Sequence, residues 1–154
     1  MSAARRPVQL GNVMSTAGAW ILACVTLATA VVTGCSSSHS SSSSCASELR
    51  ALAPITNRGV ERATGSSLDV DGANASFSPT CFTEVPRGIV TLTVRNTGQT
   101  IHNIEIAAQH IDVDIAQGRS ITVRVRVGSV PVVFICRYHR YLGMVGVLIP
   151  RPLR

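Results

Sequence analysis

The stretch that decides the fold is Phe134-Ile135-Cys136-Arg137-Tyr138-His139-Arg140-Tyr141-Leu142-Gly143-Met144-Val145-Gly146. It places a histidine three residues, and a methionine eight residues, after a cysteine. Apolar runs at residues 132–136 and 145–149 lie on either side of this loop, and both have the length of short β-strands. We therefore predict that Cys136, His139 and Met144 share one loop between two late strands, where their side chains can converge.

A fourth candidate, His102, lies upstream in Asn96-Thr97-Gly98-Gln99-Thr100-Ile101-His102-Asn103. One thiolate, two imidazoles and a thioether form the trigonal Cys-His-His set with a weak axial Met that is typical of a blue-copper electron-transfer site. Such a mixed site serves both oxidation states, because Cu(I) prefers soft sulfur whereas Cu(II) prefers imidazole. Cys136 would bind as the thiolate, and Met144 would tune the reduction potential from a long axial distance.

The alternative is that these side chains are structural. A cysteine and a methionine in an apolar strand are usually core residues, and a single histidine is usually a surface or core residue. The complete set of four, with three members at one strand end, favours ligation of one mononuclear type 1 copper ion. His39 interrupts a serine run and His110 lies in a predicted loop, so we expect both to be solvated.

These motifs resemble the cupredoxin family, and the ligand loop is most similar to that of plastocyanin. Cys136, His139 and Met144 match the family pattern C-x-x-H-x-x-x-x-M, and Gly143-Met144-Val145-Gly146 matches the family's residues on either side of the methionine. His102-Asn103 matches the His-Asn pair at the family's first ligand, and Asn96-Thr97-Gly98 matches the turn before it. Amicyanin, a relative with a shorter loop, would have its methionine at the position of Leu142, so Met144 is the axial candidate.

The resemblance covers about residues 66–150 and implies an all-β, Greek-key β-sandwich or barrel. It also implies that Asn103 fixes the ligand loop by hydrogen bonds and that the second histidine, His139, reaches the surface through an apolar patch. Tyr138, Tyr141 and Leu142 would form this patch beside Arg137 and Arg140, which would steer an acidic partner or merely solubilise the loop. The acidic patches of plastocyanin have no counterpart here, so its photosynthetic role is not carried over.

The N-terminus predicts export. Arg5 and Arg6 precede a 16-residue apolar stretch at 17–32, which is short for a membrane span. Val32-Thr33-Gly34-Cys35 resembles a bacterial lipobox, which implies that residues 1–34 are a signal peptide. Cys35 would then carry acyl chains such as palmitate and hold the protein at the extracytoplasmic face of the cell membrane. The alternative is a signal anchor that stays as a membrane helix; the serine-rich tether after Cys35 favours lipidation.

The remaining cysteines can be assigned by elimination only in part. Cys24 would leave with the signal peptide, and Cys35 and Cys136 would take lipid and copper. Cys45 and Cys81 are left, an even pair in an oxidising compartment. They form either a disulfide or two free thiols, because pairing requires a Cα separation that the sequence does not give.

Length and composition limit the number of domains and the kinds of partner and activity. The mature chain of 154 − 34 = 120 residues suits one domain and a monomer. All 14 basic residues are arginine, and removal of Arg5 and Arg6 leaves 12 against 8 acidic residues, a net charge of +4. This mild charge suits acidic partners or an anionic membrane, and no aromatic-rich basic motif indicates nucleic-acid binding. No Ser/His/Asp set, carboxylate pair or phosphate loop indicates an enzyme; we interpret Asp69, Asp71, Asp112 and Asp114 as solvated.

The predicted organisation has three parts: a signal peptide over 1–34, a linker over 35–65 and the β-domain over 66–150. In the linker, residues 36–44 read as a flexible serine-rich tether. A short helix is predicted over 47–53, capped by Ser47 and stopped by Pro54, and residues 55–67 read as loop. About seven short strands come after it, the clearest at 89–95, 101–106, 121–127, 132–136 and 145–149.

Three functions compete. The first is a membrane-anchored protein that shuttles single electrons between a membrane redox complex and a cytochrome or copper oxidase. The second is an extracytoplasmic copper carrier or buffer, and the third is a cupredoxin-like interaction module without a redox role. The full ligand set favours the first, since proteins that hand over copper usually expose open Met/His or Cys pairs.

Overall fold

The computed structural model describes residues 40–52 and 54–153. The predicted signal peptide, the lipidation site Cys35 and His39 lie outside these residues. Within the described ranges, no helix has both the length and the apolarity that a membrane span requires.

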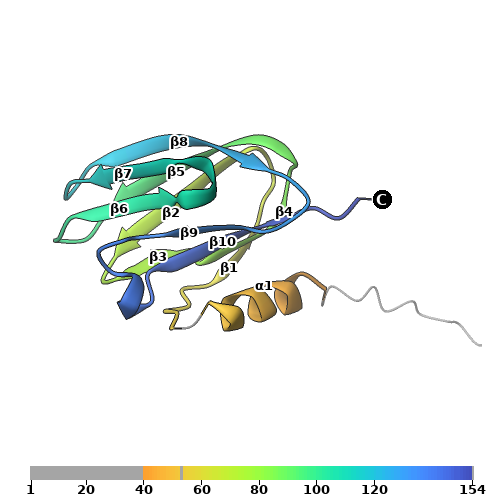
Figure 1. Ribbon diagram of the computed structural model, residues 1–154, viewed down its shortest axis with the longest axis horizontal. Helices are drawn as coiled ribbons and strands as arrows, with labels where there is room; N and C mark the ends of the chain where they lie inside the picture. Colours follow the sequence, from red (N-terminus) through yellow and green to blue (C-terminus); the bar gives the residue numbers. More distant parts are fainter. Residues whose placement is uncertain (1–39, 53, 154) are drawn as a thin grey trace, which may run out of the picture. The chain divides into compact units, whose positions relative to one another are not determined.

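The described chain forms a β-sandwich of two mixed sheets, which confirms the predicted all-β fold (Figure 1). The first sheet has six strands in the order β1-β4-β10-β9-β6-β7, and the second has four in the order β3-β2-β5-β8. The strands of the first sheet are β1 (Val60–Arg62), β4 (Cys81–Val85), β6 (His102–Ile106), β7 (Ile111–Ile115), β9 (Val132–Ile135) and β10 (Val145–Pro150). Those of the second are β2 (Ser67–Ala73), β3 (Ser76–Ser78), β5 (Gly88–Asn96) and β8 (Ser120–Val127).

Alternating side chains explain why these segments pair. In β5, Val90, Leu92 and Val94 are buried between the sheets, while Arg95 faces outward, as the period-two pattern predicts. β8 pairs antiparallel with β5 along its whole length. The core is closed by aromatic contact between the sheets, where Phe77 and Phe134 lie with ring centroids 5.0 Å apart.

The N-terminal part of the domain differs from the prediction in two ways. α1 (Ser40–Ala51) begins inside the serine run, so the prediction of a flexible tether is wrong for residues 40–44. Ser47 does not cap it; its hydroxyl donates a hydrogen bond to the carbonyl of Ser44, 2.9 Å away. Serine has a low helix propensity, and the helix is held instead by tertiary contacts, because Cys45 and Leu49 are buried against β4 and β10.

The second difference is β1, which the sequence places in a loop outside the β-domain. It pairs in parallel with β4, and the chain continues to the buried Ala63, whose N–H donates to the carbonyl of Thr83 at 2.8 Å. All three side chains of β1 are exposed, so the strand has no alternating pattern to read. The sandwich therefore begins before residue 66.

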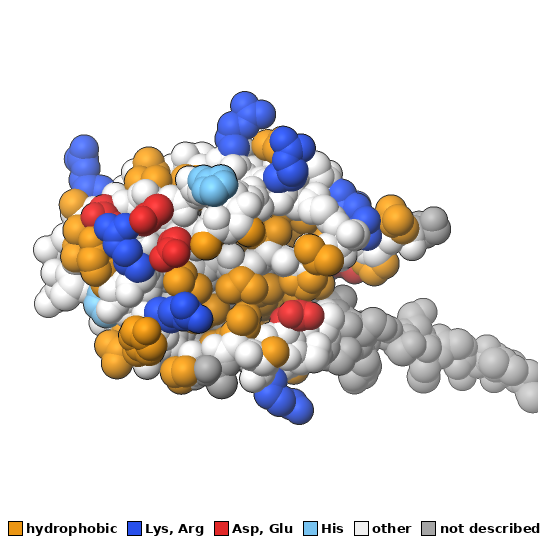
Figure 2. Space-filling model, in the orientation of Figure 1, with side chains coloured by type: hydrophobic (Ala, Val, Ile, Leu, Met, Phe, Trp, Pro, Cys, Tyr) orange, Lys and Arg blue, Asp and Glu red, His pale blue; other side chains and the backbone are white. Residues whose placement is uncertain are grey.

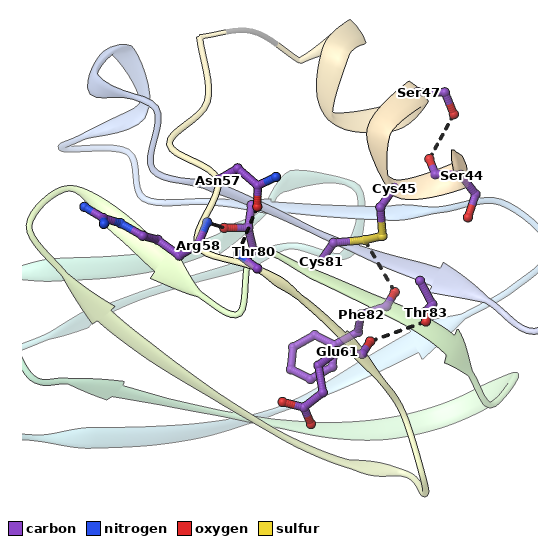
Figure 3. Close-up of a disulfide and its surroundings, with 11 residues drawn as sticks. Ser44, Cys45, Ser47, Asn57, Arg58, Glu61, Thr80, Cys81, Phe82 and Thr83 are labelled. Atoms are coloured by element: carbon purple, nitrogen blue, oxygen red, sulfur yellow. Dashed lines mark hydrogen bonds between the residues drawn. A yellow bond between two sulfur atoms is a disulfide. The ribbon is translucent and has the colours of Figure 1, made fainter. Parts of the chain in front are cut away.

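A disulfide between Cys45 and Cys81 joins α1 to β4, with the two Cα atoms 6.2 Å apart (Figure 3). Both cysteines are buried, and Val147 of β10 completes their cluster. The bridge closes a loop of 36 residues and makes α1 part of the domain.

Candidate metal centre

Four chain segments bring the predicted ligands to one end of the sandwich. His102 opens β6, Cys136 comes directly after β9, and Met144 directly precedes β10. His139 lies at the start of the short 3-10 helix η2 (Arg140–Leu142). Backbone hydrogen bonds close the loop on itself: the N–H of Cys136 donates to the carbonyl of Met144 at 3.0 Å, and the N–H of Met144 donates to the carbonyl of His139 at 3.2 Å.

Three ligand atoms form a compact triangle. Nδ1 of His102 and Nδ1 of His139 are 3.2 Å apart, and the Sγ atom of Cys136 lies 3.5 Å from the latter and 4.0 Å from the former. Metal–nitrogen bonds of about 2.0–2.1 Å and a metal–sulfur bond of about 2.3 Å in one plane would give sides of about 3.5 Å and about 3.8 Å. The triangle therefore fits one metal ion at its centre.

Met144 and the His102 ring both lie close to strand β2. A Cβ atom at Gly72 of β2 would lie 3.1 Å from Cε of Met144 and 3.7 Å from Cδ2 of His102. The methionine methyl group and the imidazole thus meet at a place where only glycine leaves room. Sequence analysis missed Gly72, because the contact joins residues from strands in different sheets.

Three of the four ligands are buried, and burial favours the neutral, metal-binding form of the His102 ring. His102, Cys136 and Met144 are buried, and His139 is half-buried. Burial first, and the charge of His139 second, hold the pKa of His102 below its usual value. A neutral ring offers a lone pair to a cation. Nε2 of His102 has no hydrogen-bond partner among the described residues, whereas Nδ1 faces His139 and Cys136 in the triangle.

The turn that carries His102 is fixed by Asn96. Its side-chain amide donates to the carbonyls of Thr100 at 2.7 Å and Ile115 at 2.8 Å, and its Oδ1 accepts from the N–H of Gly98 at 3.0 Å. Asn96 is buried, so these bonds are protected from water. They set the position at which β6 begins, and with it the position of His102.

Solved structures share this architecture at low sequence identity. The metal-binding domain of the Cu(I)-exporting P-type ATPase CopA of Streptococcus pneumoniae aligns over 62% of this chain and 98% of that domain, with 11% identity and a TM-score of 0.52. The chain has a cupredoxin-like β-sandwich fold. Reduced auracyanin from Roseiflexus castenholzii aligns over 58% of this chain and 100% of its own, at 21% identity and a TM-score of 0.49. A purple cupredoxin from Nitrosopumilus maritimus aligns over 54% and 98%, at 18% identity and a TM-score of 0.42. No protein-family model matches the sequence, and no curated protein matches it.

In this cupredoxin-like fold, Asn103 connects the two parts of the site. Its Oδ1 accepts a hydrogen bond of 3.4 Å from the backbone N–H of Arg137, the residue after Cys136. Its amide nitrogen donates to carboxylates of β7, at 2.7 Å for Asp112 and 3.1 Å for Asp114. The resemblance implied the first contact; the carboxylate contacts were not foreseen.

Arg137, one of the two arginines expected to steer a partner, is held in ion pairs. Arg137 forms ion pairs with Asp112 and with Asp114, the latter at 2.8 Å. The two aspartates, interpreted from sequence as merely solvated, are exposed but fully engaged. Arg140 is exposed and makes no ion pair with a described residue. The charge of Arg137 is therefore balanced by the two aspartates, and steering of a partner by either arginine stays a prediction.

The surface around His139 is largely apolar or uncharged. Tyr141 is 85% and Leu142 64% exposed. A cavity of about 630 Å³ lies beside His139 and is lined otherwise by uncharged residues: Ala73, Asn74, Ala75, Thr97, Gly98, Gln99, Thr100 and Leu142. Figure 2 shows hydrophobic side chains exposed together with charged ones at this end of the sandwich, on the left of the view.

The segment between α1 and β1 braces the ligand loop. The backbone N–H of Thr56 donates to the carbonyl of Gly143 at 3.0 Å, and its hydroxyl donates to the carbonyl of Leu142 at 3.2 Å. Gly143 has a φ of +93°, and a Cβ atom there would lie 2.6 Å from the nitrogen of Thr56. Glycine is therefore required between Leu142 and Met144 both by the backbone conformation and by the close contact.

Proposed function

We propose that the protein binds one copper ion through His102, Cys136 and His139, with Met144 as the axial ligand, and transfers single electrons. The convergence of two Nδ1 atoms and one Sγ atom within 3.2–4.0 Å of one another carries this proposal. The donor set suits copper in both oxidation states, and bound copper would supply the one-electron chemistry.

The protein's own residues would supply the thiolate ligand and hold the four ligands in position. The Cys136 thiol would lose its proton on binding, since the thiolate is the ligand form. The backbone bonds between Cys136, His139 and Met144, together with those of Asn96, would hold the ligands in place. Ligands that move little between oxidation states impose a small reorganisation cost, which is what fast electron exchange requires.

Electrons would enter and leave through His139. It is the one member of the triangle that is not fully buried, and it borders the uncharged cavity beside Leu142. An uncharged contact of this kind lets a redox partner approach the ring closely without desolvating charges. We propose a cytochrome or a copper oxidase as the partner, with the protein acting as a monomer.

The two other functions are disfavoured by the burial of the sulfur ligands and by the presence of the ligand triangle. Cys136 and Met144 are 0% exposed, so a receiving protein could reach neither sulfur without opening the loop, as a copper carrier would require. An interaction module without a redox role would not need a ligand triangle at all.

The decisive experiment loads the full chain with one equivalent of Cu(II) and records its visible spectrum. An intense thiolate-to-copper band is expected, because the Cys136 thiolate would be a ligand of the copper. Cys136→Ser should remove the band, and Cys45→Ser with Cys81→Ser should keep it. A Cys136→Ser protein that stayed blue would refute the assignment. Reversible reduction with constant copper content would distinguish electron transfer from copper delivery.

We also propose that Cys35 carries the lipid anchor at the extracytoplasmic face of the membrane. Cys35→Ala should block processing or release the protein from the membrane fraction. Release of the unmutated mature protein from membranes without detergent would contradict lipidation.

A further inference from the structure

The two strands that bring the ligands together are barely paired. β6 carries His102 and β9 leads into Cys136, yet their ladder consists of one residue pair, Glu105 with Ile135. Continued in the same antiparallel register, the next positions toward the site would be Asn103 opposite Arg137. There the backbone N–H of Arg137 donates to the Asn103 side chain instead of to a strand carbonyl. At the metal-binding end, side chains must therefore hold the strands together.

Two carboxylates lie next to this unpaired end of β6 and β9. Asp112 and Asp114 alternate along β7 with Ile111, Val113 and Ile115, so both face outward on the same side of the strand. β7 pairs antiparallel with β6, with Asp114 opposite Asn103. The carboxylates therefore flank the residue that comes after His102.

Both residues between Cys136 and His139 bind this pair. The Arg137 guanidinium contacts Asp112 and donates to Oδ1 of Asp114 at 2.8 Å. The Tyr138 hydroxyl donates to the other oxygen of Asp114, Oδ2, also at 2.8 Å. Arg137 further contacts Tyr138 by a hydrogen bond of 3.0 Å and lies over its ring, 4.9 Å from the centroid.

Each triangle ligand thus has a sequence neighbour attached to this carboxylate pair: Asn103 and Arg137 contact both aspartates, and Tyr138 contacts Asp114 alone. Asn103 comes after His102, Arg137 comes after Cys136, and Tyr138 precedes His139. We propose that Asp112 and Asp114 are positioning residues of the copper site, which join strand β6 to the ligand loop and so fix the separation of the three ligand atoms. This inference rests on the proposed copper function.

Contacts within the cluster favour the charged forms of Asp112 and Arg137. The hydrogen bond from Asn103, and then that from Arg137, lower the pKa of Asp112 although partial burial opposes them. The hydrogen bond with Tyr138 and the nearby carboxylates raise the pKa of Arg137. Two carboxylates and one guanidinium give the cluster a net charge of −1, which lies beside the metal site and favours the more positive oxidation state.

The test replaces both carboxylates in the full chain, as Asp112→Ala with Asp114→Ala. All four ligands remain, so copper should still bind, but with affinity lowered by about 10–100-fold, the usual effect of losing groups that orient metal ligands. The visible band should shift, and the reduction potential should rise because the local charge becomes +1. Asp112→Asn with Asp114→Asn keeps oxygen acceptors and should restore most of the spectrum while retaining the raised potential.

The matched control is Asp69→Ala. This aspartate is also exposed on a strand and also pairs with an arginine, Arg95 at 3.2 Å, but on β2 and β5 of the other sheet. It should leave spectrum, potential and affinity unchanged. Tyr138→Phe, which removes one hydroxyl and keeps the fold, should lower copper affinity by less than the double alanine variant does.

A readout without copper separates this inference from the proposed function. In the metal-free protein, amide hydrogen exchange over residues 136–144 should be faster in the double alanine variant than in the unmutated chain and in Asp69→Ala. An unmutated protein that showed no blue band would refute the copper function. A blue unmutated protein whose double alanine and Tyr138→Phe variants matched it in spectrum, potential, affinity and loop exchange would refute the positioning role.

Discussion

Gly98 and His102 lie close to each other across the turn before β6. A Cβ atom at residue 98 would stand 3.0 Å from Nε2 of His102, on the side of the ring away from the ligand triangle. The turn thus supports the back of the imidazole, and its main chain is itself held by Asn96. A side chain at residue 98 would therefore press on the His102 ring.

Gly98→Ala should therefore shift the His102 ring and weaken copper binding. The added methyl group must displace the ring by a few tenths of an ångström. We expect copper affinity to fall about tenfold, which is the lower end of the range for losing a group that orients a metal ligand. The visible band should also shift. Gly128→Ala is the control, because a Cβ atom there meets nothing within 4 Å. Equal spectra and affinities for the two variants would show that the turn does not set the ring position.

Met144→Leu should keep copper and colour but raise the reduction potential, because loss of the axial sulfur disfavours Cu(II). The measurement is protein-film or solution voltammetry of the loaded protein. Leu142→Ala, at a position that is 64% exposed, should change the potential much less. A larger effect at residue 142 would mean that the methionine is not the axial donor.

Charge steering should depend on Arg140 rather than on Arg137. Electron transfer to an acidic redox partner should slow as salt rises to physiological strength, where the screening length is about 8 Å. Arg140→Glu should reduce the rate at low salt with the spectrum intact. Arg137→Glu should change the spectrum itself, because it places a third carboxylate against Asp112 and Asp114. If neither salt nor Arg140→Glu changes the rate of electron transfer, electrostatic attraction does not assist docking of the partner.

Replacing the bridge, as Cys45→Ala with Cys81→Ala, should lower the free energy of unfolding by about 3–4 kcal/mol, as expected for closure of a loop of this length. Denaturant unfolding of the metal-free protein measures it. The copper spectrum should be unchanged, because the bridge lies between α1 and β4 and not in the ligand loop. Under reducing conditions the difference in stability should largely vanish; if it is absent under oxidising conditions too, the cysteines do not pair in solution.

The sequence predicts those features that are encoded locally. Cys136, His139 and Met144 lie within nine residues of one another, so their spacing alone places them on one loop. β5 and β8 were predictable because each buries alternate apolar residues. β1 was not, since its side chains are exposed and only its backbone pairing with β4 makes it a strand.

Contacts between distant residues explain the other differences. Asp112 and Asp114 alternate with apolar residues, a pattern that is equally typical of an unengaged, solvated strand face. Their partner Arg137 lies 23 residues beyond Asp114, and its choice of partner depends on how β9 and β7 are placed. The helical state of Ser40–Ser44 likewise depends on Cys45 meeting Cys81, 36 residues away.

Cys136 is the one free cysteine in the described part of the chain, and it is buried. Three cysteines can close three different bridges, and two of these would consume the copper ligand. The folded protein avoids both, because α1 presents Cys45 to Cys81 while the sandwich encloses the third thiol. An unfolded chain has no such protection. We therefore expect the yield of functional protein to depend on whether folding or copper capture outruns oxidation, so that maturation is a kinetic competition for a single sulfur atom.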